Sequence, residues 1–60
     1  TLIDDVLATG GTLEAAIALV ADAGGEVTSI VVLLEIASLE GRQRLEKVAT
    51  HIPIHALVTI

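Results

Sequence analysis

Two adjacent carboxylates and a glycine-rich turn lie close together near the start of the chain. Residues 2–12 read Leu-Ile-Asp-Asp-Val-Leu-Ala-Thr-Gly-Gly-Thr, with the acids at Asp4 and Asp5. Glycines let the backbone curl so that successive N–H groups converge on one point. Thr12 is placed to cap a helix whose positive dipole end would face the turn. Such a turn binds phosphate, and the acids beside it could accept hydroxyl groups or hold a hydrated metal.

The elements that would position these residues alternate between strand and helix. The pattern predicts strands at residues 1–6, 27–36 and 54–60, a helix at 13–23, a short helix at about 39–47, and the phosphate loop at 7–12. A strand–helix–strand unit of this length favours parallel strands. The sequence therefore predicts an open parallel α/β sheet, in which ligands bind at the carboxyl ends of the strands.

Hydrophobic patterning indicates how these elements are covered. Residues 30–34 are continuously apolar, which is typical of a strand buried on both faces. In the first helix, Leu13, Ile17 and Val20 share one face, and so few positions are polar that we expect most of its circumference to be covered. Gly24-Gly25 is a helix stop, because glycine adopts the left-handed conformation easily.

Composition limits the domain and its partners. The chain has 60 residues, 53% of them hydrophobic, with no aromatic residue and no cysteine. A domain of this size buries only about 60% of its unfolded surface, so we expect the C-terminal part of one larger domain. Part of the apolar surface would then be covered by the rest of that domain and part by a second subunit, which predicts a homodimer.

Charge and hydropathy argue against two classes of partner. The net charge is −5, with only three basic residues, whereas a nucleic-acid site needs clustered lysine and arginine. No apolar run approaches the roughly 18 residues of a membrane span. We therefore expect neither nucleic acid nor membrane as a partner, and we take the cytoplasm as the default location.

The glycine loop does not fit the two commonest nucleotide motifs. A Walker loop ends in Gly-Lys-Ser/Thr, but no lysine occurs before Lys47. A dinucleotide fingerprint requires Gly-x-Gly-x-x-Gly, which Gly10-Gly11-Thr12 does not supply. A ligand with a terminal phosphate and neighbouring hydroxyl groups, such as ribose 5-phosphate, fits the loop and its acids.

Residues 2–12 resemble the phosphoribosyl-pyrophosphate motif of the type I phosphoribosyltransferases, and within that family the adenine-specific branch. Hypoxanthine enzymes usually have Glu-Asp before the loop, and uracil enzymes place a proline after the first acid. The similarity continues through Leu-Glu-Ile at residues 34–36 and Leu-Glu-Gly-Arg at residues 39–42. It covers most of residues 1–45, whereas residues 56–60 are only loosely like the ending of the adenine enzymes.

The resemblance implies transfer of ribose 5-phosphate from phosphoribosyl pyrophosphate to adenine, giving AMP and pyrophosphate. Asp4 and Asp5 would approach the ribose hydroxyls, and either could stabilise an oxocarbenium-like transition state. The 5-phosphate would be wrapped by five residues: Ala8, Thr9, Gly10, Gly11 and Thr12. Mg²⁺ would be bound mainly through the substrate pyrophosphate rather than by residues of this chain. The groups that select the base and bind pyrophosphate are expected upstream of Thr1, so the 60 residues alone should not catalyse.

Two other functions remain open beside this enzyme. One is a regulator of the same fold that senses ribose phosphate without chemistry, and the other is a phosphoribosyltransferase for a different base. Regulators usually deviate in the loop and have a basic DNA-binding segment, whereas here the loop is intact and the chain is acidic. The enzyme is therefore the favoured interpretation.

The remaining charged residues allow structural interpretations. His51 and His55 are four apart, but Pro53 lies between them and no third ligand completes a metal set, so a surface or sheet-edge role is expected. Glu35 ends a buried strand and could lie at the solvent edge or near the site.

The basic residues after Gly41 have several interpretations. Arg42 and Arg44 are expected to face solvent or a neighbouring subunit, with phosphate binding as the alternative. Glu40 and Arg44 have the i,i+4 spacing of a helical ion pair. Gly41 is an unfavourable residue inside the predicted short helix.

Overall fold

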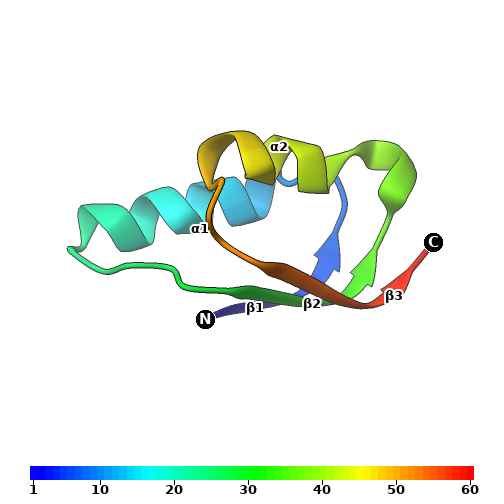
Figure 1. The fold of residues 1–60 in the computed structure, drawn as a ribbon, viewed down its shortest axis with the longest axis horizontal. Helices are drawn as coiled ribbons and strands as arrows, with labels where there is room; N and C mark the ends of the chain where they lie inside the picture. The colour runs from blue at the N-terminus through cyan, green and yellow to red at the C-terminus, as the bar shows by residue number, and fades with distance from the viewer.

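A sheet of three parallel strands underlies both helices of the computed structural model, which describes residues 1–60 (Figure 1). The elements, in chain order, are β1 (Leu2–Leu7), α1 (Gly11–Asp22), β2 (Ile30–Glu35), the 3₁₀ turn η1 (Ala37–Leu39), α2 (Gly41–Val48) and β3 (Ile54–Thr59). Strand β2 lies between β1 and β3. The predicted open parallel α/β sheet is confirmed.

The strand register aligns two fully apolar rows across the sheet, at residues 2, 30 and 54 and at residues 6, 34 and 58. Leu2 pairs with Ile30 and Ile30 with Ile54, so the strands begin side by side. At the other end, Leu7 pairs with Glu35. This end is the carboxyl end of every strand, and the loop into α1 leaves from it.

The core lies between the sheet and the two helices, which cover the same face (Figure 1). It consists of Leu7, Leu13, Val27, Ile30, Val32 and Leu45. Ile17 and Val20 pack against this core from α1, as the helical spacing predicted. Apolar side chains thus lie at most of the strand positions that face the helices, with Glu35 as a charged exception.

The opposite face of the sheet is bare within these 60 residues, so the predicted burial of β2 on both faces is met on one face only. Leu33 is 55% exposed, and Ile3 and Leu57 are exposed beside it. Helix α1 is likewise covered on one side only, with Leu19 at 69% exposure. An unbroken apolar run indicates surfaces suited to burial, but both helices of this chain pack on the same side.

Several element boundaries differ from the predictions. Strand β2 begins at Ile30 rather than at residue 27, although Val27 is buried before it. The short helix predicted at about 39–47 is two pieces, because Glu40 adopts the left-handed conformation, with φ 58°, between η1 and α2. Strand β1 is shifted by one residue at each end from its predicted range, and β3 begins at Ile54 as predicted but ends one residue earlier. No helix combines the length and the apolarity that crossing a membrane requires.

Candidate ribose-phosphate site

The loop between β1 and α1 turns sharply at Gly10. Gly10 has φ 87°, and its carbonyl accepts a hydrogen bond from the Glu14 N–H at 2.9 Å, so Gly10 is the N-cap of α1. The prediction that Thr12 caps the helix is wrong: Thr12 is the second helical residue, and no side chain caps α1. The left-handed glycine turns the chain into the helix two residues earlier than a threonine cap would have done.

The start of α1 has a run of uncommitted backbone donors. No hydrogen bond to the backbone or to a side chain is donated by an N–H of residues 8–13. The first N–H groups of a helix have no acceptor within the helix, and the helix dipole adds positive potential there. Thr9 and Thr12 are exposed at the same place and add two hydroxyl groups. Such a group of donors suits an anion with several oxygens, such as a phosphate.

Gly41, at the start of α2, fixes the position of this loop. A Cβ added to Gly41 would lie 2.2 Å from the carbonyl oxygen of Ala8 and 2.9 Å from the Gly10 nitrogen. A Cβ on Gly10 would in turn lie 2.8 Å from the Gly41 carbonyl oxygen. Gly10 and Gly41 are both buried. The two backbones therefore touch because neither residue has a side chain.

This role of Gly41 was not predicted from the sequence, in which the residue stands out only as a poor helix former. A glycine that interrupts a helical pattern often marks a close backbone approach, which was the available signal. The pattern could not identify the approaching partner, because Ala8 and Gly10 lie more than 30 residues away in the sequence.

Asp4 and Asp5 lie within β1 rather than at its end, because the strand continues to Leu7. Side chains do not alternate strictly between the two faces along β1, because Leu2 and Leu7 both pack in the core although they are five residues apart. Asp4 aligns with buried Val32, and Asp5 is exposed. Each carboxylate accepts the N–H of the next residue: Asp5 N to Asp4 Oδ1 at 2.8 Å, and Val6 N to Asp5 Oδ1 at 2.9 Å.

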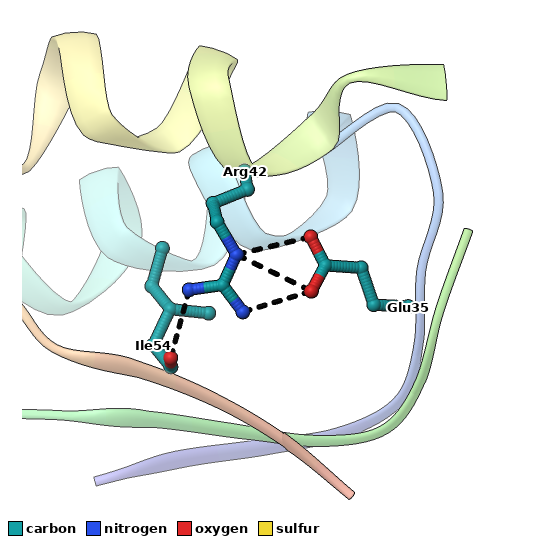
Figure 2. Close-up of polar contacts among 3 residues, drawn as sticks. All are labelled: Glu35, Arg42 and Ile54. Carbon is teal, nitrogen blue, oxygen red and sulfur yellow. Dashed lines mark hydrogen bonds and ion pairs between the residues drawn. The ribbon is translucent and has the colours of Figure 1, made fainter. Parts of the chain in front are cut away.

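Glu35 is buried and paired with an arginine rather than lying at the solvent edge, and it aligns with Leu7, where the phosphate loop begins. Its side chain is 8% exposed, and Arg42 Nε and Nη2 donate to its two oxygens at 2.8–3.2 Å (Figure 2). Arg42 Nη1 donates to the Ile54 carbonyl at 2.9 Å. The arginine thus joins α2 to the end of β2 and the start of β3. Arg42 was expected to face solvent or a subunit, and instead it links α2 to the sheet through Glu35 and the Ile54 carbonyl.

The ion pair shifts the titration of both partners. Hydrogen bonding by the Arg42 guanidinium lowers the pKa of Glu35 below its ordinary value of 4.5, against the opposing effect of burial. The same hydrogen bond raises the pKa of Arg42. Glu35 therefore stays ionised at neutral pH although it is buried, and it is already paired with Arg42.

Arg44 forms the second ion pair of α2, and the partner differs from the predicted one. Its Nε donates to Glu14 Oε2 of α1 at 2.8 Å, which raises the pKa of Arg44. The predicted pair with Glu40 is wrong, because Glu40 is left-handed and lies outside the regular helix. The side chains of Arg44 and Glu14 are 50% and 36% exposed, so water screens this pair far more than it screens Glu35 and Arg42.

The remaining titratable residues form no metal-binding cluster, and two hollows lie away from the loop. No three histidine, aspartate or glutamate side chains converge, and His51 and His55 are both exposed, as predicted. Two hollows, of about 600 and 320 Å³, lie beside α2 and between α1 and residues 48–52. None of residues 2–12 lines either hollow, so the phosphate loop is an open surface turn and not a cavity wall.

Comparisons with known proteins agree with this arrangement. Residues 2–58 match the family model described as phosphoribosyl transferase domain. The adenine phosphoribosyltransferase of Streptomyces galbus is 51% identical over 59 residues, which are 98% of this chain and 32% of that relative. The chain thus spans about a third of the length of this relative.

Solved structures give the same result. The adenine phosphoribosyltransferase of Rhodothermus marinus superposes with a TM-score of 0.87 at 48% identity, over 97% of this chain and 31% of that one. The Trypanosoma brucei enzyme, solved with AMP, pyrophosphate and ribose-5-phosphate, superposes with a TM-score of 0.81 at 35% identity, over 97% and 26%. With its glycine turn, acids and parallel sheet in the family's order, the chain belongs to the phosphoribosyl transferase domain family.

Proposed function

We propose that the full-length protein transfers ribose 5-phosphate from phosphoribosyl pyrophosphate to adenine, giving AMP and pyrophosphate in purine salvage. The observation that carries this proposal is the run of uncommitted N–H groups at residues 8–13, directly after Asp4 and Asp5. Relatives about half identical to the chain are named adenine phosphoribosyltransferase, which supports adenine as the acceptor.

In this proposal the loop holds the 5-phosphate. Ala8 to Thr12 supply amide N–H groups, and Thr9 and Thr12 also supply hydroxyl donors, which match the acceptor oxygens of a phosphate. Gly41 keeps the loop in place while the ligand enters and leaves. Since the donors are fixed before binding, little conformational entropy is lost when the phosphate arrives.

Asp4 and Asp5 receive the ribose. Carboxylates accept hydrogen bonds from paired hydroxyls, and one near the anomeric carbon stabilises positive charge that develops there. Because Asp4 is half-buried and Asp5 is exposed, we expect unequal effects from their substitution. If Asp5→Asn left both nucleotide affinity and turnover unchanged, its assigned role would be wrong.

Other parts of the reaction lie outside these residues. We assign Mg²⁺ to the pyrophosphate of the substrate, where it would neutralise the leaving group. Base selection and pyrophosphate binding belong to other parts of the protein, and the 60 residues alone should make no AMP. We further propose a cytoplasmic homodimer, for which the bare apolar sheet face offers support.

The test is pyrophosphate release by the full-length protein with adenine, guanine, hypoxanthine and uracil in parallel. We expect release with adenine to exceed that with each other base. Release with another base would reassign the substrate. Binding of phosphoribosyl pyrophosphate without release for any base would favour the regulator instead. AMP synthesis by residues 1–60 alone would show that the missing groups are not needed.

A further inference from the structure

The guanidinium of Arg44 lies beside the first turn of α1. A Cβ added to Gly11 would be 3.5 Å from Arg44 Nη1 and 3.9 Å from Cζ. The same point is 3.7 Å from the hydroxyl oxygen of Thr9. The arginine, which belongs to α2, therefore reaches across to the phosphate loop and lies at van der Waals distance from the position of a Cβ at Gly11.

Glu14 fixes this position while leaving most of the guanidinium free. Only Nε of Arg44 donates a side-chain hydrogen bond, to Glu14 Oε2 at 2.8 Å. The N–H groups of Nη1 and Nη2 have no acceptor in the chain, and half of the side chain is exposed. In Arg42, two residues earlier, Nε, Nη1 and Nη2 are all engaged. Of the two arginines of α2, only Arg44 therefore has guanidinium N–H groups free to donate to a ligand.

The charges around the loop indicate what the free N–H groups of Arg44 could bind. The loop offers neutral amides and hydroxyls, Glu14 is negative, and the chain has a net charge of −5. A phosphate dianion entering there would be repelled by Glu14 unless a cation offset it. Arginine is suited to this because its planar fork donates two parallel hydrogen bonds to phosphate oxygens.

We propose that Arg44 is a further 5-phosphate-binding residue, that its Nη1 and Nη2 donate to the phosphate oxygens, and that Glu14 orients it through Nε. This inference rests on the proposed function, because it assigns a residue to the same ribose-phosphate site. It gives α2 two contacts with the ligand loop: Gly41 sets the backbone and Arg44 supplies the cation.

The test compares AMP with adenosine, which lacks the phosphate, by calorimetric titration of the full-length protein. Arg44→Gln should weaken AMP binding about tenfold or more, because a charge-assisted hydrogen bond is lost, and leave adenosine binding unchanged. Lys47→Gln is the matched control: it removes the same charge from the last turn of α2 and should change neither affinity. Arg44→Lys should recover part of the loss, since it keeps the charge but not the planar fork.

The outcomes separate this inference from the function on which it rests. Equal losses for AMP and adenosine in Arg44→Gln, or equal AMP losses in Arg44→Gln and Lys47→Gln, would overturn the role of Arg44. An AMP preference over adenosine that is unchanged in Arg44→Gln would overturn it as well, with the ribose-phosphate site intact. A wild-type protein that binds AMP no tighter than adenosine would contradict the proposed function itself. Urea denaturation of each variant confirms that the fold is retained.

Discussion

Helix α1 has a glycine pair at each end. The two pairs have similar backbone conformations, but the N–H groups of one pair are hydrogen-bonded and those of the other are free. The first glycine of each pair is left-handed, with φ 87° at Gly10 and 84° at Gly24. At the end of α1, the Gly24 and Gly25 N–H groups bond the carbonyls of Ala21 and Val20 at 3.0 and 2.9 Å. This is a Schellman stop, which consumes its donors. At the start of α1, the Gly10 and Gly11 N–H groups donate to nothing in the chain.

The surroundings of the two pairs differ as much as their donors. A Cβ on Gly24 would meet nothing within 4 Å, whereas Gly10 is buried against Gly41. The start of a helix also attracts anions, while its end repels them. A glycine turn is thus suited to binding where its N–H groups are left free and a second element fixes its backbone. Substitutions at each contact test this difference.

The largest effect is expected from Gly41→Ala. Its Cβ would lie 2.2 Å from the Ala8 carbonyl oxygen, and backbone cannot swing away as a flexible side chain would. We expect a loss of about 3 kcal/mol in the free energy of unfolding and weaker AMP binding, because α2 must move away from the loop. Urea denaturation and AMP titration of the full-length protein measure both. Normal stability and normal affinity together would contradict the packing described for Gly41.

Arg42→Ala should cost slightly less, about 2 to 3 kcal/mol. It leaves Glu35 buried without a partner, but Arg42 itself is 35% exposed, so the loss falls at the low end for a buried pair. Urea denaturation measures it. Glu35→Leu combined with Arg42→Met should recover much of the stability, because a buried pair replaced by apolar side chains leaves no isolated charge. A double variant no more stable than Arg42→Ala would contradict the assigned cause.

Gly10→Ala should destabilise the protein by about 2 kcal/mol, from the left-handed φ and from contact with the Gly41 carbonyl. It should also weaken AMP binding, since the loop N–H groups lose their alignment. The combination with Gly41→Ala should cost less than the sum of the two losses of stability. Each substitution forces the same two backbones apart, so the second clash is partly removed by the first. Strict additivity, measured by urea denaturation, would argue that the two glycines do not touch.

Gly24→Ala is the matched comparison, with an expected loss of about 1 kcal/mol from the left-handed φ alone. Its Cβ points into open space, and its N–H is used within the helix stop. AMP affinity should therefore remain at the wild-type value. An affinity loss as large as that of Gly10→Ala would mean that both variants act through the stability of α1 and not through the loop.

The smallest effect is expected from pH. Because the pKa of Glu35 is below 4.5 in the folded protein, its contribution to stability is fully present at neutral pH. It begins to fall as the pH approaches 4.5 and is lost as the pH falls through the folded pKa. The stability difference between wild type and Glu35→Gln should therefore shrink on acidification, as urea denaturation at a series of pH values would detect. A difference independent of pH would contradict the ion pair.

Local patterns predicted the elements but not the contacts between them. The alternation of strand and helix, the glycine turn and the stop at Gly24 follow from short stretches of sequence, and all three are present in the structure. The touching backbones of Gly10 and Gly41, and the pairing of Glu35 with Arg42, depend on which elements the sheet brings together. The apolar run of β2 could not reveal that both helices lie on one face. Of the site, the loop could be predicted, whereas the support from α2 could not.

Amide chemical shifts under titration with ribose 5-phosphate test the loop most directly. In the ¹⁵N-labelled full-length protein we expect the largest shift changes at residues 8–13, with Gly10 and Gly11 foremost. The Gly24 and Gly25 resonances should stay in place and act as the internal control. Binding of ribose 5-phosphate with no change at residues 8–13, or with equal changes at both glycine pairs, would contradict a phosphate site at the start of α1.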